Sequence, residues 1–502
     1  MEEIVLKTKI LIIVIAAVVV AGAAVGIGFA IYNNTPEVVA ANAIEGVFRD
    51  FAERDEIKPV ANMLEKGSLT ISASELYAKY DGERDDAFDE EFEVNGKVYF
   101  SKDAIMLDEL KFEYGQDFKL SGSAYISADK IYVQENEIFD ATIGLIKGEL
   151  ADDLKDSIFA YDSESDFAIP DEEAYNIILA VLEYYDELDT KEFEKDAEKL
   201  VKRYSKDIYK IFCENAEFEA ENDKVKLNGE KKSVRVITIK FDEGDVAEMV
   251  EQICEYICED EELLEFIEKY TEDLDDAFEE ELNDAGYSSI ADAYEDLIDN
   301  LDDEIDSICD GIKESEFKIA IEIVTPKLSS TLLKLSVSVD KEDLFELDFG
   351  PKGIKKTNII SLTVAGNKDN KIEYEVRENN MSEYKSELRV GKQEICEIEV
   401  DRKKDTFEIN VNDYIEISGS MSKKGDTTTI EFEEMVMPYG EGKIYSDLTI
   451  VIDEKDKMPA PEKKFDSIAD IKVEDIEEWM EKISEIDFGG ATEEDTPMDP
   501  EW

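Results

Sequence analysis

The amino-acid sequence predicts an α+β protein, in which an N-terminal transmembrane helix precedes a large curved antiparallel β-sheet that packs on or around a central group of amphipathic helices. Three observations support this prediction. Residues 10–31 carry no charge, two long parts of the chain alternate apolar and polar residues with period two, and a helical period replaces that alternation between them. The chain has 502 residues, 43% of them hydrophobic, which is enough for a sizeable core.

The uncharged segment, residues 10–31, is predicted to be a transmembrane helix. At about 1.5 Å per residue, a helix of this length reaches roughly 33 Å, which is enough to cross a bilayer. The apolar stretch is longer than that of a cleaved signal peptide, and the nearest Ala-Asn-Ala sequence, at 41–43, lies well beyond it. These features favour an uncleaved anchor over a signal peptide.

The charges beside this helix predict its orientation. Lys7 and Lys9 precede it, and positive residues stay on the cytoplasmic side, so residues 1–9 should be cytoplasmic and the chain from about residue 33 onward extracytoplasmic. Gly22 and Gly26 form a GxxxG pattern, which allows two membrane helices to pack closely, although glycine is also common in membrane helices in general.

The remaining chain divides into five segments by periodicity. Residues 36–66 are predicted to be a helical stalk, residues 67–170 an N-terminal β-meander with one polar face, and residues 171–315 an acidic helical region with one β-hairpin, turned at Asn228-Gly229. Residues 316–464 read as about ten strands of a C-terminal antiparallel meander. Residues 465–502 are predicted to form a C-terminal helix and a polar tail.

A sheet of this size with one apolar face must curl, stack on another sheet or be covered by helices. We therefore expect the central helices to cover or fill a strongly curved sheet made from both strand regions. Two independent α+β domains, divided near residue 314, are the alternative.

The N-terminal anchor, the meandering strands and the helices that would fill a concave sheet resemble N-terminally anchored extracytoplasmic proteins of Gram-positive bacteria. The pattern is also similar to the curved half-barrel of lipoprotein carriers. That resemblance implies a groove for acyl chains. The resemblance is one of strand and helix pattern over about residues 60 to 453, and no motif residue of the family can be placed on this sequence.

Composition excludes several functions. The chain has no histidine, so a Ser-His-Asp or Cys-His nucleophile and a His-ligated metal are excluded. Against 127 acidic residues there are only 55 basic ones, which argues against nucleic acid as a partner. We find no phosphate-binding loop, dinucleotide fingerprint or nucleophile elbow, and expect neither a cofactor nor enzymatic activity.

The acidic residues are concentrated between residues 251 and 310, which contain 25 Asp and Glu and one basic residue, Lys269. Clustered carboxylates can bind Ca²⁺, but the sequence has no loop of the EF-hand type. Both predicted helices of this hairpin keep an apolar stripe, so the acidic positions are expected to face water or a cationic partner.

Tyrosines and cysteines are the two residue types that offer candidate sites. Tyr175, Tyr184, Tyr185, Tyr204 and Tyr209 lie on helices expected to face the sheet, where they would line an apolar groove or form ordinary core. The five cysteines are an odd set with apolar neighbours, which favours mostly buried thiols over a disulfide from Cys309 to the Cys254/Cys258 pair.

The sequence thus predicts a single-pass, membrane-anchored, extracytoplasmic binding domain that is not an enzyme. It would hold a lipid or another apolar or amphipathic ligand in the concave sheet. One alternative is a structural or adhesive surface protein whose acidic face binds cationic proteins or Ca²⁺. Another is a carboxylate-dependent glycan hydrolase, because paired carboxylates catalyse glycoside hydrolysis without histidine.

Overall fold

A computed structural model describes residues 35–54, 57–74, 76–80, 83–84, 92–114, 118–161, 163, 165, 167–275, 278–364, 371–412, 414–436, 443–462 and 464–484. The protein is α+β with a large open antiparallel sheet, which confirms the predicted class. The predicted membrane helix, with Gly22 and Gly26, lies outside the described residues. Among the helices that are described, none is both long and apolar enough to span a membrane.

The chain forms two compact units, and each is built from separated segments. The first unit contains residues 1–58 and 187–403, and the second contains residues 59–186 and 404–502. The alternative of two domains divided near residue 314 is therefore wrong. The C-terminal strands beyond residue 403 pair with strands from the N-terminal meander, so position along the chain does not separate the units.

The strands of the first unit form an antiparallel meander in which each strand pairs with the next one in sequence. The hairpin at Asn228-Gly229 has positive φ angles at both residues (44° and 89°), the conformation that favours this dipeptide in two-residue turns. The strands are β9 (Glu217–Leu227), β10 (Glu230–Asp242), β11 (Lys318–Thr325), β12 (Lys334–Val339), β13 (Glu342–Asp348), β14 (Ile359–Val364), β15 (Lys371–Asn379), β16 (Glu383–Val390) and β17 (Gln393–Asp401).

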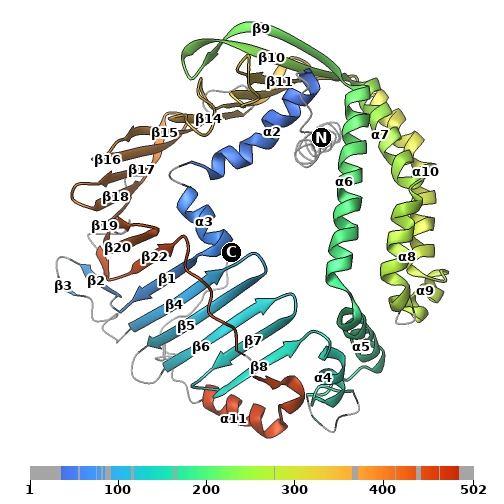
Figure 1. Cartoon of the computed structure of the whole chain (residues 1–502), viewed down its shortest axis with the longest axis vertical. Coiled ribbons are helices and arrows are strands. Elements are labelled where there is room, and N and C mark those ends of the chain that lie inside the picture. The colour runs from blue at the N-terminus through green and yellow to red at the C-terminus, as the bar shows by residue number, and fades with distance from the viewer. Residues whose placement is uncertain are drawn as a thin grey trace, which may run out of the picture. The chain divides into compact units, whose positions relative to one another are not determined.

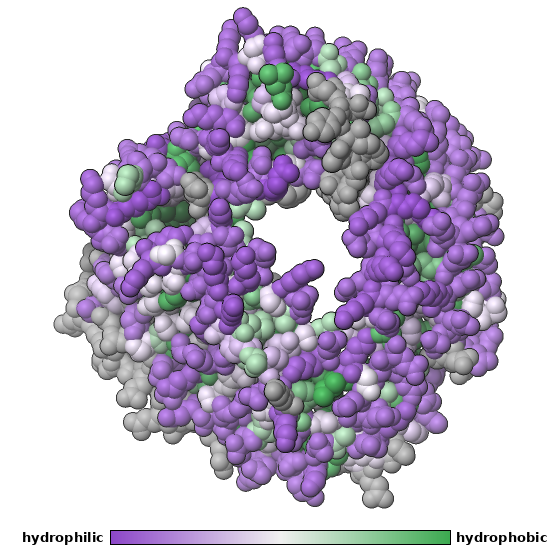
Figure 2. Space-filling view, in the orientation of Figure 1, coloured by the Kyte–Doolittle hydropathy of each residue, from purple (hydrophilic) through white to green (hydrophobic). Residues whose placement is uncertain are grey.

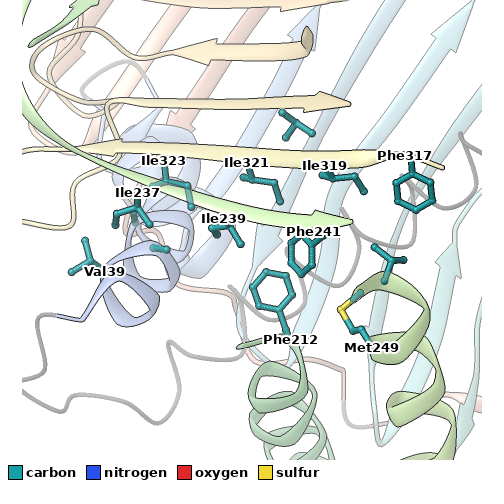
Figure 3. Close-up of a cluster of buried hydrophobic side chains, with 14 of the residues drawn as sticks. Val39, Phe212, Ile237, Ile239, Phe241, Met249, Phe317, Ile319, Ile321 and Ile323 are labelled. Carbon is teal, nitrogen blue, oxygen red and sulfur yellow. The ribbon is translucent and has the colours of Figure 1, made fainter. Parts of the chain in front are cut away.

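Helices pack on one face of the first strands of this meander. In β10 and β11 the directly opposed pairs Ile237–Ile323, Ile239–Ile321 and Phe241–Ile319 point into the same core. Figure 3 shows these side chains beside Val39, Phe212 and Met249, which come from three helices. The helices of the first unit are α2 (Pro36–Ala52), α6 (Thr190–Asn215), α7 (Glu243–Cys258), α8 (Glu261–Asp275), α9 (Glu279–Ala285) and α10 (Ile290–Lys313).

The predicted helical stalk needs correction. Residues 36–66 are helical, as α2 and α3 (Lys58–Lys66), but α2 is not a free spacer. Its Val39, Ala40 and Ala43 are buried in the main core of the first unit. Small residues at these positions bring α2 close to the sheet, so α2 is part of the globular fold.

In the second unit, strands from both ends of the chain form one antiparallel array. Its order is β8–β7–β6–β5–β4–β1–β22–β20–β19–β18. From the N-terminal meander come β1 (Ser68–Ala73), β4 (Phe92–Phe100), β5 (Ala104–Tyr114), β6 (Phe118–Ser127), β7 (Lys130–Glu135) and β8 (Ala141–Ile146), and from the C-terminal part come β18 (Thr406–Val411), β19 (Ile415–Lys424), β20 (Thr427–Val436) and β22 (Thr449–Asp453).

Short elements complete the second unit. β2 (Leu76–Tyr80) pairs with β3 (Glu83–Arg84) and β21 (Lys443–Ser446), and β23 (Asp466–Ser467) runs parallel to β8. The predicted meander over residues 67–170 omits helix α4 (Leu150–Asp156), whose Ala151 and Leu154 are buried. Two further helices are α5 (Glu172–Glu187) and α11 (Val473–Ser484).

Candidate functional site

The strands of the second unit have apolar residues on both faces of the sheet. Directly opposed residues in an antiparallel pair share a face. One face carries the row Ser68, Tyr99, Met106, Tyr125, Tyr132 and Gly144, each directly opposite the next. The other, which we call the aliphatic face, carries Leu69, Ile71, Val98, Ile105, Leu107, Ala124, Ile126, Ile131, Val133, Ile143 and Leu145.

The first of these faces is covered by the chain that follows β22. Figure 1 shows this segment crossing β4–β8 on its way to α11. Phe465 stacks on Tyr132, with ring centroids 5.8 Å apart, and the Glu462 backbone N–H donates to the Tyr132 hydroxyl at 3.0 Å. Gly144 makes room for the Phe465 ring, which would lie 2.5 Å from a Cβ at that position. Tyrosines on this face are therefore core.

The aliphatic face remains exposed. Ile126, Val133 and Ile105 are 54%, 50% and 48% exposed, and Ile131 and Ile71 are also exposed. The six strands that carry this face, β1 and β4 to β8, would span roughly 24 Å at their usual spacing of about 4.8 Å. Contiguous apolar surface of this kind is uncommon on soluble proteins and marks interaction sites.

Helix α5 adds apolar surface at the turn end of these strands. The Tyr185 hydroxyl donates to the Ala128 carbonyl at 3.2 Å, and Asp186 accepts from the Gly148 and Ala151 backbone N–H groups. No described residue of α5 is fully buried, and its Ile178 and Val181 are exposed. The helix thus has contacts near both ends, while Ile178 and Val181 in its middle remain accessible.

The five candidate tyrosines lie on two helices, one in each unit. Tyr175, Tyr184 and Tyr185 lie on α5 in the second unit, where Tyr175 packs against Tyr161. Tyr204 and Tyr209 lie on α6 in the first unit.

The two tyrosines of α6 are packed within the first unit. The Tyr204 ring is edge-on to Tyr256 at 5.2 Å, and the Tyr209 hydroxyl donates to the Glu37 carbonyl at 2.8 Å. Burial raises the pKa of both hydroxyls. Their position is that of core residues, which was the other interpretation of this tyrosine set.

The acidic helices have a largely polar surface. Figure 2 shows the surfaces of α6, α8 and α10 as predominantly hydrophilic. The one basic residue of α8, Lys269, contacts Glu192 and Asp196 of α6 at 2.7 and 2.9 Å. Hydrogen bonds from Lys199, Lys269 and Tyr270 lower the pKa of Asp196. Within the described chain, the one group of three carboxylates close enough to share a metal ion is not on these helices.

That group consists of Glu387, Glu394 and Glu397 on β16 and β17. Glu387 is only 1% exposed, and both of its oxygens are ion-paired, one with Arg377 and one with Arg389. Burial and a hydrogen bond with Glu387 raise the pKa of Glu394. Because two guanidinium groups already neutralise the buried carboxylate, we interpret the group as a structural charge network and not as a cation site.

All five cysteines are free thiols, and Cys309 is buried. The Cys309 thiol donates to the Ala247 carbonyl at 3.4 Å. Burial raises the pKa of Cys213 to about 11. Burial also raises the pKa of Cys254, Cys309 and Cys396, and a raised thiol pKa opposes nucleophilic reactivity, so these four cysteines belong to the packing of the first unit.

With the geometry established, known proteins add no assignment. No protein-family model matches the sequence, and no curated protein matches it. The candidate site therefore depends on the structure. Sequence analysis missed the aliphatic face, although the signal was present: β4 to β7 place apolar residues at both odd and even positions, so both faces are apolar.

Proposed function

We propose that the protein is a single-pass, membrane-anchored, extracytoplasmic binding domain, and that the aliphatic face of its second unit is the binding surface. The observation that carries this proposal is the exposure of Ile105, Ile126 and Val133 in the middle of a sheet whose opposite face is packed. The predicted curvature of the sheet would bring the rows of this face around an apolar or amphipathic ligand. The activity is binding, without a catalytic step.

The expected affinity follows from the area involved. Full burial of an aliphatic side chain contributes about 1.5–3 kcal/mol, so covering the five exposed residues, each already about half buried, would contribute on the order of 4–7 kcal/mol. Association costs reduce this gain. A small neutral probe should therefore bind only weakly, and a ligand covering several strands more tightly.

A double substitution, Ile126→Thr with Val133→Thr, is expected to weaken binding of the neutral dye Nile red about tenfold. Threonine keeps the β-branched shape that favours a strand but presents a hydroxyl to the ligand. Emission is measured with the full chain in phosphatidylcholine nanodiscs at equal disc concentration, so that the lipid contribution is common to all variants.

The matched control is Val201→Thr, which changes a residue that is 58% exposed on α6 in the first unit. This variant should bind the dye as the unsubstituted chain does. Equal dye binding by all three proteins would contradict the proposed function.

A further inference from the structure

The charges around the aliphatic face indicate what it binds. Between residues 92 and 149, where most of this face lies, the sequence has 11 acidic and six basic residues. An imbalance alone says little, because acidic residues dominate the whole chain. The pairing of these charges within the second unit is more informative.

The basic residues of this region are mostly engaged. Lys97 contacts Asp456 at 2.5 Å, Lys111 contacts Glu93 at 2.6 Å and Lys119 contacts Glu113 at 3.4 Å. Lys130 donates to the Glu462 carbonyl at 2.7 Å, and the Lys147 ammonium lies over the Tyr185 ring at 5.2 Å. The exception is Lys102, beside Asp103. Few cations therefore remain to attract an anionic headgroup.

In contrast to these lysines, four carboxylates at the strand ends have no ion-pair partner in the described part of the chain. Asp103 lies in the β4–β5 turn, Asp129 in the β6–β7 turn, Asp140 before β8 and Glu149 after it, and all four are exposed. Among the described residues, none of these four is in an ion pair. They stand at both ends of the strands whose middles carry the aliphatic face.

An aliphatic surface with unpaired carboxylates at its ends is complementary to a molecule with an apolar side and positive charges. The face is open and extends over several strands, which suits an elongated ligand. We infer, on the basis of the proposed function, that the ligand is a cationic amphipathic peptide. Its apolar side would lie on the aliphatic face, and its Lys or Arg side chains would reach the carboxylates at the strand ends.

The test compares two synthetic amphipathic peptides of equal length, with leucine on the apolar side and either lysine or glutamate on the polar side. Binding of labelled peptide to the full chain is followed by fluorescence anisotropy in phosphatidylcholine nanodiscs, with empty discs as the reference. The lysine peptide should bind at least tenfold more tightly at low salt, and the difference should shrink as salt screens the charges.

Two variants separate this inference from the proposed function. Asp103→Asn with Asp129→Asn and Asp140→Asn should reduce the preference for the lysine peptide several-fold and leave Nile red binding unchanged. Ile126→Thr with Val133→Thr should weaken binding of both the lysine peptide and the dye.

Each contrary result has a distinct meaning. Equal binding of the two peptides, with dye binding still sensitive to the threonine substitutions, would overturn the peptide inference and leave the proposed function standing. Unchanged binding of the lysine peptide by the threonine variant would also overturn it, because the peptide would then be held by acidic surface elsewhere. If the threonine substitutions leave Nile red binding unchanged, that result would contradict the proposed function itself.

Discussion

Replacing Phe241 by alanine is expected to destabilise the first unit by about 3–5 kcal/mol, the range typical of a buried phenylalanine. Phe241 is 2% exposed, lies in the core next to the last residue of β10, and packs on Phe212 with ring centroids 5.2 Å apart. Its removal would leave a cavity between the sheet and α6. Hydrogen exchange followed by mass spectrometry should show a large loss of protection in β10 and β11.

The control for this substitution is Leu297→Ala on α10, where the side chain is largely exposed. It should change stability by no more than about 0.5 kcal/mol, as is usual for surface positions. Protection of β10 and β11 that is equal in the two variants would show that Phe241 does not have the packing described here.

Replacing Glu387 by alanine is the second substitution that we expect to lower stability strongly. Its carboxylate is buried between Arg377 and Arg389 on the polar face of β15 and β16. Breaking a fully buried ion pair costs about 3–5 kcal/mol. Each arginine is about one-third exposed, so water would partly solvate the two guanidinium groups left without a partner. We therefore expect Glu387→Ala to lower the free energy of unfolding by roughly 2–3 kcal/mol.

Two comparisons make the Glu387 prediction specific. Glu399→Gln removes a half-exposed partner of Lys385 and should cost less than about 1 kcal/mol, as surface ion pairs do. Replacing Arg377, Glu387 and Arg389 together by apolar residues of similar volume should be less harmful than Glu387→Ala, because no buried charge is left alone. Denaturant titration of each variant measures these differences. A Glu387→Ala variant as stable as Glu399→Gln would be inconsistent with the network.

The sequence predicts local features of this fold well, for physical reasons. Period-two alternation and the Asn228-Gly229 turn are set by neighbouring residues, and the predicted strands and hairpin are present. The pairing of β1 with β22 joins residues 68–72 to residues 449–453, and nothing in either segment specifies the other. The division into interleaved units follows from such long-range pairs, so it was not predictable from one sequence.

The candidate site was only partly accessible to sequence reasoning. An apolar ligand surface in a concave sheet was predicted, but its candidate side chains were tyrosines of the helices and not residues of the strands. Tyr132 and Val133 are neighbours on β7, and alternation does not reveal which of the two faces is covered. That depends on Met458 and Phe465, far away in sequence, which pack on the tyrosine face. The ion pairs of Glu387 could not be predicted from the sequence either, because only the strand register identifies its two arginine partners.

The most direct test of the aliphatic face is photochemical labelling of the full chain in nanodiscs with a neutral alkyl diazirine. Mass spectrometry would locate the labelled residues on the extracytoplasmic part of the chain. We expect the labels to concentrate on β4 to β8, around Ile105, Ile126 and Val133, and to decline in the Ile126→Thr/Val133→Thr variant. Labelling of α6 around Val201 as strong as that of these strands would contradict the proposed binding surface.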